Sequence, residues 1–249
     1  TGDIEFTPVL EDVQTLNHWA IERKLDITKL SYGVLPLVLN TYKVLNSGSA
    51  LGKGVGPILI AKNDLDATNV EDQLVAIPGK NTTAHLLFSL KYPAAKNKVF
   101  IRYDEIQYFV LQGKGLGVII HENRFTYEEK GLKKIIDLGD FWEQETKVPI
   151  PLGGIVVRKT FDASLQQRVD NLIKKSIEYA YTNYPELNDY IRENSQEMSE
   201  DVMRKHIDLY VNEYSLDLGS EGKIAVQKLV NVFAAMNGTS LDSANIFVG

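Results

Sequence analysis

The chain has 249 residues, 44% of them hydrophobic and 24% charged, which is typical of a globular protein with one large domain or two small ones. Its 33 acidic and 27 basic residues give a net charge of -6, and it has no basic run, so we do not expect nucleic acid as a partner. No apolar run approaches the ~20 residues that span a bilayer, so we do not expect a membrane as a partner either. The absence of cysteine excludes disulfides and zinc-thiolate sites from the printed residues and fits a cytoplasmic location.

The N-terminal part of the chain predicts short strands that alternate with helices. Residues 4–6 alternate apolar and charged side chains, as a short strand does. Apolar residues at 13, 16, 20 and 21 share one face of a helix that begins after two acids and ends in basic residues, as the helix dipole favours. A second strand is expected over 25–30, and a short helix from Pro36 to about Tyr42.

Residues 48–57, G-S-A-L-G-K-G-V-G-P, are the part of the chain richest in glycine. They do not form a Walker loop, because no glycine lies five residues before Gly52 of the Gly-Lys pair. They do not form a G-x-G-x-x-G fingerprint either, because Pro57 takes the place of the third glycine. A nucleotide site is therefore not expected. These glycines allow a positive φ and a close backbone approach, either to a ligand or to a neighbouring strand.

Strands are expected over 58–61 and 74–77, and the second leads through a glycine-containing turn to Thr82, Thr83 and an apolar helix over 84–90. The backbone N–H groups and hydroxyls of such a helix start attract carboxylate or phosphate. Threonine also caps helices where no ligand is present, so both interpretations stay open.

A second strand-helix-strand unit is expected over 99–120, with its helix over 104–112. Short apolar runs that alternate with helices of this length are typical of parallel β-α-β units. The last strand ends abruptly in four polar residues, His121 to Arg124. Ligands bind at the carboxyl ends of strands in open α/β sheets, and imidazole exchanges protons near neutral pH, so His121 is a candidate base. The alternative is a structural histidine bonded to backbone.

After a further strand over 154–157, the pattern from Asp162 onward is helical only. Helices are expected around 169–180, from Pro185, over 199–212 and over 222–235. We interpret this block as architectural, either covering one face of a sheet or bracing two lobes.

Several reaction classes lack their motifs. The four histidines, at 18, 85, 121 and 206, lie far apart in sequence, and Phe125 occupies the position of the second histidine in H-E-x-x-H, so a metal site has no support. No G-x-S-x-G nucleophile elbow is present. The remaining features suit proton abstraction beside a carbonyl, or simple capture of a ligand.

Seven blocks occur in an order that resembles the 1,4-dihydroxy-6-naphthoate synthase family. They are P-V-L-E-D-V-Q-T-L-N (8–17), T-K-L-S-Y (28–32), G-K-G-V-G-P (52–57), P-G-K-N-T-T-A (78–84), I-I-H-E-N-R-F-T-Y (119–127), D-L-G-D-F-W-E (137–143) and P-L-G-G-I (151–155). This family acts late in the futalosine route to menaquinone. The resemblance implies an α/β protein with a two-lobed fold like type II periplasmic binding proteins and a helical C-terminal region. We expect lobe 1 to comprise 1–75 and 156–249, and lobe 2 to comprise 76–155.

The resemblance also implies roles for individual residues. His121 matches the general base, Lys29, Ser31 and Tyr32 match one wall of the cleft, and Thr82 and Thr83 match the substrate-binding residues of the other lobe. The implied substrate is the small molecule cyclic dehypoxanthinyl futalosine, which loses its sugar-derived part to leave the dihydroxynaphthoate. Proton removal beside the ring ketone gives an enolate, a C–C bond breaks, and aromatisation drives the reaction, so no metal or redox cofactor is expected. The substrate carboxylate suits the helix start at Thr82 and Thr83.

Members of this family begin with a strand and a cleft-facing loop resembling S-P-C-P-N-D-T-F. The printed chain opens at Thr1 without that segment and without a visible signal peptide, and we expect the segment to exist outside the printed residues. Two alternatives to the lyase are kept. One is the chorismate dehydratase of the same pathway and fold, and the other is a solute-binding protein that closes on a small anion without turnover.

Overall fold

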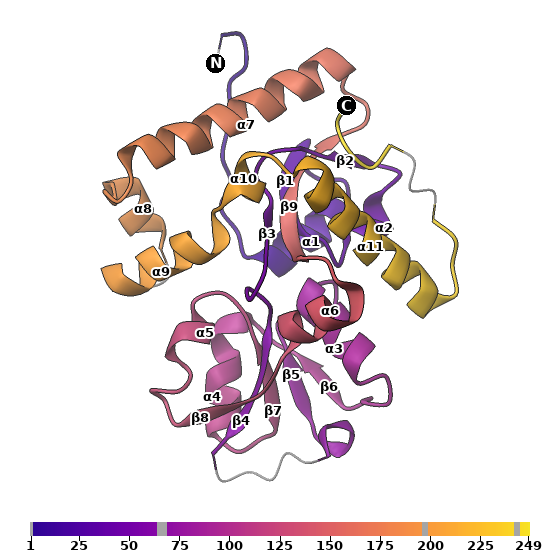
Figure 1. Ribbon diagram of the computed structural model, residues 1–249, viewed down its shortest axis with the longest axis vertical. Coiled ribbons are helices and arrows are strands. Elements are labelled where there is room, and N and C mark those ends of the chain that lie inside the picture. The colour runs from indigo at the N-terminus through magenta and orange to yellow at the C-terminus, as the bar shows by residue number, and fades with distance from the viewer. Residues whose placement is uncertain (1, 64–68, 196–198, 242–244) are drawn as a thin grey trace.

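The computed structural model describes residues 2–63, 69–195, 199–241 and 245–249, and the chain forms two lobes around two sheets (Figure 1). In the view of Figure 1, the first sheet lies in the upper lobe and the second in the lower lobe. The chain passes from the first sheet to the second after β3 and returns before β9. Two segments of the chain therefore connect the upper lobe to the lower lobe.

The upper sheet is organised around one central strand, β9 (Ile150–Arg158), with which its other strands pair antiparallel. The apolar run of β9 is buried over most of its length, as expected of a strand covered on both faces. Its partners are β1 (Ile27–Ser31), β2 (Tyr42–Val44) and β3 (Ala50–Gly52). The strand predicted over 154–157 is confirmed and begins earlier, at Ile150.

The lower sheet has five strands in the order β6-β5-β7-β4-β8. The strand β5 pairs parallel with both β6 and β7, which confirms the predicted β-α-β units, whereas β4 pairs antiparallel with β7 and β8. The carboxyl ends of β5 and β7 consequently lie at the same edge of the sheet. The strands are β4 (Ile58–Lys62), β5 (Val75–Ile77), β6 (Lys98–Phe100), β7 (Leu116–Ile119) and β8 (Leu132–Asp137).

Helices and turns cover both sheets, and side chains at their first residues explain where several begin. The Asp12 carboxylate accepts hydrogen bonds from the backbone N–H groups of Gln14 and Thr15 and so starts α1. Thr82 and Asp137 cap α3 and α6 in the same way. The elements are α1 (Val13–Ile21), α2 (Leu35–Val38), η1 (Val70–Asp72), α3 (Thr83–Lys91), η2 (Tyr103–Glu105), α4 (Ile106–Leu111), α5 (Asn123–Thr126) and α6 (Leu138–Thr146).

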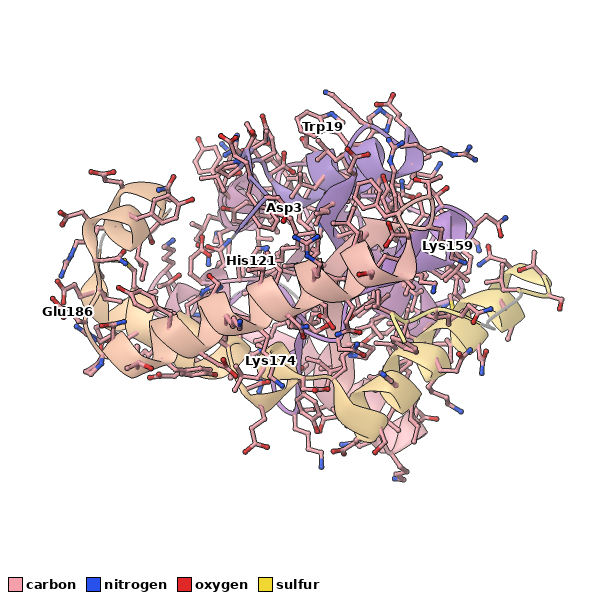
Figure 2. The ribbon with its side chains drawn as sticks, turned by 90° about the horizontal axis from the view of Figure 1, so that it is seen from above. Asp3, Trp19, His121, Lys159, Lys174 and Glu186 are labelled. Carbon is pink, nitrogen blue, oxygen red and sulfur yellow. The ribbon has the colours of Figure 1, made fainter. Side chains whose placement is uncertain are left out.

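The C-terminal region is helical, as predicted. Its helices are α7 (Ala163–Asn183), α8 (Asp189–Asn194), α9 (Glu200–Tyr210), α10 (Glu213–Leu216) and α11 (Gly219–Asn237). Seen from above, α7 crosses the molecule and leads, near Glu186, to α8 and α9, which together form a C-terminal arm at the opposite side from Lys159 (Figure 2). The helix α11 packs against α2 and β9. Among the described residues, no helix is both long and apolar enough to cross a membrane.

One apolar core runs through both lobes. It includes Leu30 and Val156 of the upper sheet and Leu59 and Val118 of the lower sheet. The helix α6 contacts β4, β8 and β9 where the lobes meet, and its Trp142 is completely buried. Continuous apolar packing of this kind holds the two lobes together.

Residues 4–6 do not form the short strand that the sequence predicts. Their backbone pairs with neither sheet, and a strand is stable only where a neighbouring strand accepts its hydrogen bonds. The helix predicted from Pro36 to Tyr42 is also shorter, because α2 ends at Val38 and Tyr42 already belongs to β2.

The chain passes from one sheet to the other at positions that differ from the predicted lobe boundaries. The boundary after residue 75 places β4 in the first lobe, whereas β4 pairs with β7 and β8 of the lower sheet. The boundary after residue 155 splits β9, which belongs entirely to the upper sheet. Each of these strands has the apolar composition of a buried strand, and that composition does not specify which sheet the strand joins.

Candidate active site

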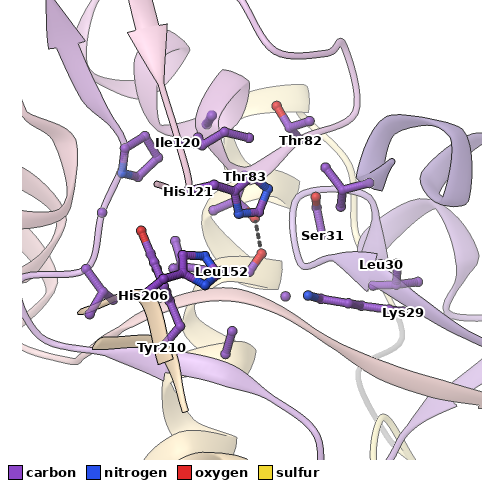
Figure 3. A pocket seen from close by; sticks show the side chains of 17 residues that line it. Lys29, Leu30, Ser31, Thr82, Thr83, Ile120, His121, Leu152, His206 and Tyr210 are labelled. Atoms are coloured by element: carbon purple, nitrogen blue, oxygen red, sulfur yellow. Dashed lines mark hydrogen bonds between the residues drawn. The ribbon is translucent and has the colours of Figure 1, made fainter. Parts of the chain in front are cut away.

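Two cavities that share several lining residues lie between the lobes. The inner cavity has a volume of about 100 Å³ and the outer cavity about 690 Å³, and both are lined by Lys29, His121, His206 and Val13. The inner cavity is otherwise mainly apolar, whereas the outer one carries several acids and an arginine. Figure 3 shows the inner cavity, with side chains from both lobes and from the C-terminal arm pointing into it.

His121 lies two residues after the end of β7, as the sequence predicts, and its ring faces the inner cavity (Figure 3). Its backbone is left-handed, with a φ of 57°, a conformation that costs a residue with a β-carbon about 1–2 kcal/mol. The ring centroid lies 5.2 Å from that of Tyr103 and 6.1 Å from that of His206. The backbone conformation thus directs the imidazole out of the sheet edge and toward the space between the lobes.

The surroundings of His121 keep its imidazole neutral. Burial among protein atoms, together with the smaller effects of the positive charge of Lys29 and of His206, lowers its pKa to about 3. At neutral pH the ring therefore carries a free lone pair and can accept a proton.

Lys29 lies in β1 between two buried neighbours, Thr28 and Leu30, so its side chain points the other way, into the cleft. Surrounding protein lowers the pKa of its amine. Within the described residues the amine forms no hydrogen bond or ion pair, and no carboxylate lines the inner cavity. A cation placed in this way attracts an anionic ligand, because no carboxylate of the described residues forms an ion pair with it.

Ser31 also lines the inner cavity, as predicted, and its position is held by Asn17. The Asn17 amide donates to the Ser31 Oγ at 3.1 Å, and the Ser31 N–H donates to the Asn17 Oδ1 at 2.8 Å. Tyr32 does not line either cavity. Its side chain is completely buried in the core and its hydroxyl lies 2.6 Å from the Ser49 Oγ, because the next residue of an extended strand points to the opposite face.

Thr82 and Thr83 line the inner cavity at the start of α3. The Thr82 Oγ1 donates to the Gly79 carbonyl at 2.8 Å and accepts from the His85 N–H, so it caps the helix. The Thr83 Oγ1 accepts from the Gly33 N–H at 3.0 Å and donates to the Leu152 carbonyl at 2.8 Å. Both hydroxyls thus have protein partners, and those of Thr83 belong to the other lobe.

Gly33 allows this contact between the lobes. A β-carbon at Gly33 would lie 2.5 Å from the Thr82 carbonyl carbon and 2.6 Å from the Thr83 nitrogen, which are backbone atoms that cannot move aside. Glycine is therefore required where the upper lobe meets the start of α3.

The glycine-rich loop is part of one of the two connections between the lobes, and four of its residues line the inner cavity: Ala50, Val55, Gly56 and Pro57. Gly56 packs against Gly139 at the start of α6, where a β-carbon on Gly56 would lie 2.3 Å from the Gly139 Cα. The Arg124 guanidinium donates to the Gly56 carbonyl and to the Asp137 carboxylate, the latter at 3.1 Å. The glycines here allow close approach both to the cavity and to another backbone segment.

His206 and Tyr210 of α9 are cavity residues that the sequence prediction missed. The prediction treated the C-terminal helices as architectural and set the histidines aside because they are distant in sequence. Residues 202, 203, 206, 207 and 210 share one helical face, and all five line one or both cavities. A histidine on an otherwise apolar helical face is the sequence signal that could have identified His206 as a cavity residue.

His206 is neutral and partly enclosed. Burial and, to a smaller extent, the positive charge of Lys29 lower its pKa to about 4. Its ring centroid lies 4.7 Å from that of Tyr210, and its Nε2 is buried with no hydrogen-bond partner among the described residues. No three His, Asp or Glu side chains gather as metal ligands in the described parts of the chain.

A family model described as menaquinone biosynthesis matches residues 1–235. The chain belongs to the menaquinone biosynthesis family. It is 45% identical to a 1,4-dihydroxy-6-naphtoate synthase of Thermus thermophilus over 227 residues, 91% of this chain and 82% of the relative. It is 36% identical to the enzyme of the same name from Streptomyces coelicolor over 244 residues, 94% of this chain and 86% of the relative. The resemblance seen in the sequence is confirmed, and this family member is an enzyme.

Solved structures confirm the expected fold. A protein from Archaeoglobus fulgidus superposes with a TM-score of 0.85 at 30% identity, covering 92% of this chain and 86% of that one. The periplasmic aliphatic sulphonate binding protein of Escherichia coli superposes with a TM-score of 0.60 at 10% identity, covering 96% and 80%. The menaquinone biosynthesis enzyme thus has the two-lobed fold of periplasmic binding proteins.

Proposed function

We propose that the chain is a carbon–carbon lyase that converts cyclic dehypoxanthinyl futalosine to 1,4-dihydroxy-6-naphthoate, with His121 as the general base. The observation that carries this proposal is the inner cavity itself. There, a neutral imidazole faces an ammonium group, and no carboxylate among the described residues lines the space. Such a cavity accepts a proton from a substrate and stabilises the anion that remains.

The chemistry assigned to the cavity follows from its two nitrogen groups. His121 takes a proton from the carbon beside the ring ketone, and the electron pair of the C–H bond forms an enolate. The Lys29 ammonium, which faces the same cavity, then stabilises the enolate charge. When the enolate returns to the ketone, its electron pair forms a C=C bond in the ring and the bond to the sugar-derived part breaks. The departing fragment keeps the electrons of that bond and takes the proton from His121, and aromatisation of the remaining ring makes the reaction favourable.

The carboxylate of the substrate is assigned to the start of α3. Thr82, Thr83 and Ala84 line the inner cavity at this helix start, where backbone N–H groups attract anions. The hydroxyls of both threonines already have protein partners, so the proposed contact uses the backbone of this turn rather than the hydroxyls. Ser31, on the facing lobe, completes the proposed substrate-binding residues.

The proposal is tested by incubating the chain with cyclic dehypoxanthinyl futalosine and identifying products by chromatography and mass spectrometry. We expect dihydroxynaphthoate from the wild-type chain and from the control His18→Gln, whose histidine is exposed on α1 outside both cavities. Dihydroxynaphthoate should be absent with His121→Ala. A parallel incubation with chorismate tests for the dehydratase of the same pathway.

Each alternative has a distinct outcome in this experiment. A dehydration product from chorismate, with no dihydroxynaphthoate from the other substrate, assigns the chain to the dehydratase step. Tight binding of the substrate with no product from either incubation favours a solute-binding protein and contradicts the proposal. A cytoplasmic site of action is part of the same proposal, and fractionation of cells that express the full-length protein tests it.

A further inference from the structure

We propose that the outer cavity binds the sugar-derived part of the substrate, and that the Tyr103 hydroxyl recognises this part through a hydrogen bond. The inference rests on the proposed lyase function and deepens it, because it assigns the hydroxylated half of the substrate to a site of its own. Tyr103 is thereby a specificity-determining residue, whereas the proton transfer stays with His121.

The outer cavity has the size and the position that such a fragment needs. Its volume of about 690 Å³ lies within the ~300–1,000 Å³ that is typical of small-molecule sites. Its walls come from the start of α1, from η2, and from α8 and α9 of the C-terminal arm. It shares Lys29, His121 and His206 with the inner cavity, so one substrate molecule can extend from the proposed base into the outer cavity.

The two cavities differ in charge in a way that orients the substrate. Lys29 gives the inner cavity a positive charge, and no carboxylate of the described residues lines that space. The outer cavity has more carboxylates than cations, and its charged residues are Glu11, Asp12, Glu122, Glu193, Lys29 and Arg102. The anionic end of the substrate is therefore favoured in the inner cavity, whereas hydroxyl groups meet hydrogen-bond acceptors in the outer one.

Tyr103 lies in the outer cavity directly beside the proposed base. Its ring centroid is 5.2 Å from that of His121, and the two ring planes are inclined at 74°. The Tyr103 side chain is half-buried and lines the outer cavity but not the inner one. A fragment bonded close to the carbon that His121 deprotonates therefore meets the Tyr103 side chain as it extends outward.

The Tyr103 hydroxyl is available to a ligand. It forms no hydrogen bond to any residue that the structure describes, yet its oxygen is not buried, so it remains accessible in the cavity. Burial of the ring and, to a smaller extent, the nearby Glu122 carboxylate raise the pKa of Tyr103 to about 12. The hydroxyl consequently keeps its proton at neutral pH, and it can both donate a hydrogen bond to a hydroxylated fragment and accept one from it.

The test compares the substrate with a ligand that lacks the sugar-derived part. The two probes are cyclic dehypoxanthinyl futalosine and 1,4-dihydroxy-6-naphthoate, and isothermal titration calorimetry under nitrogen gives the Kd of each. All titrations use the full chain with His121→Gln, so that the substrate is not consumed. Tyr103→Phe, which removes only the hydroxyl, is added to this background. Tyr108→Phe is the matched control, because Tyr108 is exposed on α4 and lines neither cavity.

We expect Tyr103→Phe to raise the Kd of the substrate about 10-fold, the effect of losing one hydrogen bond, and to leave the Kd of the naphthoate within about twofold. Tyr108→Phe should change neither Kd. Thermal unfolding of each variant shows that the comparison is made between folded proteins.

Three results overturn the inference. The first is a substrate Kd that Tyr103→Phe leaves unchanged, and the second is an equal rise for both ligands, because the hydroxyl then contacts the ring. The third is a substrate that does not bind. Turnover is measured separately in the chain with its native His121. A chain that binds the substrate with the expected dependence on Tyr103, but forms no product, contradicts the lyase function and leaves the binding site in place.

Discussion

Apart from Tyr210, the polar side chains of the inner cavity fall into two sets that differ in whether their atoms form hydrogen bonds within the protein. The hydroxyl set consists of Ser31, Thr82 and Thr83, and each of its oxygens takes part in a hydrogen bond within the protein. The nitrogen set consists of Lys29, His121 and His206, whose side-chain nitrogens have no hydrogen-bond partner among the described residues. Satisfied groups build the cleft, and unsatisfied groups remain available for the substrate.

Among the predictions that follow from these two sets, His121→Gln has the largest expected effect. We predict that kcat falls about 1,000-fold, because glutamine keeps the polarity of the site but cannot take a proton at neutral pH. The melting temperature should not fall, since the imidazole forms no hydrogen bond within the described structure that the variant would break. Steady-state kinetics with product identification checks the first part, and thermal unfolding checks the second. Retention of more than a tenth of wild-type kcat would remove His121 from the chemistry.

Lys29→Met sharpens the comparison by removing one charge from the nitrogen set. We predict that kcat falls about 100-fold, because the enolate formed during the reaction loses one charge-assisted contact. The loss of a neighbouring positive charge should also raise the pKa of His121 above its present value of about 3. The acid limb of the pH–rate profile then moves to higher pH. Lys29→Arg keeps the charge and serves as the control, and an unchanged kcat in the methionine variant would contradict the prediction.

Thr83→Ala tests the hydroxyl set. The Thr83 hydroxyl links Gly33 and Leu152 of the upper lobe to the start of α3, so its removal leaves a buried N–H and a carbonyl without that partner. We predict a loss of about 1–3 kcal/mol in the free energy of unfolding, measured by chemical denaturation. Thr83→Ser keeps the hydroxyl and should stay near wild type. Equal destabilisation of both variants would show that the methyl group, not the hydrogen bonds, matters.

The smallest expected effect is a pH dependence of stability that arises from the two histidines. Their folded-state pKa values of about 3 and about 4 lie below the ordinary value of 6.5, so the unfolded chain binds more protons as the pH falls below 6.5. Stability should therefore decrease from pH 7 to pH 5, by on the order of 1 kcal/mol for each ring. His206→Gln should flatten this slope in chemical denaturation curves. An unchanged slope would show that the ring is already hydrated in the folded protein.

Much of the fold and one side of the site could be predicted from local sequence. The parallel unit around β5, β6 and β7 follows from its alternating apolar runs, and the end of β7 places His121 at the sheet edge. The capping role of Thr82 was likewise among the alternatives that the sequence offered.

The remainder depends on packing between segments that are far apart in the chain. His206 reaches the cleft because the C-terminal arm folds back onto it, and no local pattern specifies that contact. Tyr32 was assigned to the cleft with its neighbours Lys29 and Ser31, but the pleat of the extended chain places it in the core. The membership of β4 in the lower sheet also depends on which strands it meets, not on its own composition.

The most direct test of the division between the two sets measures dihydroxynaphthoate formation per folded molecule for His121→Gln and Thr83→Ala under identical conditions, with cyclic dehypoxanthinyl futalosine as substrate. We predict that His121→Gln is stable and inactive, whereas Thr83→Ala is less stable and retains kcat within about tenfold of wild type. The opposite pattern, an active His121→Gln and a stable Thr83→Ala without activity, would contradict the assignment of chemistry to the nitrogen set.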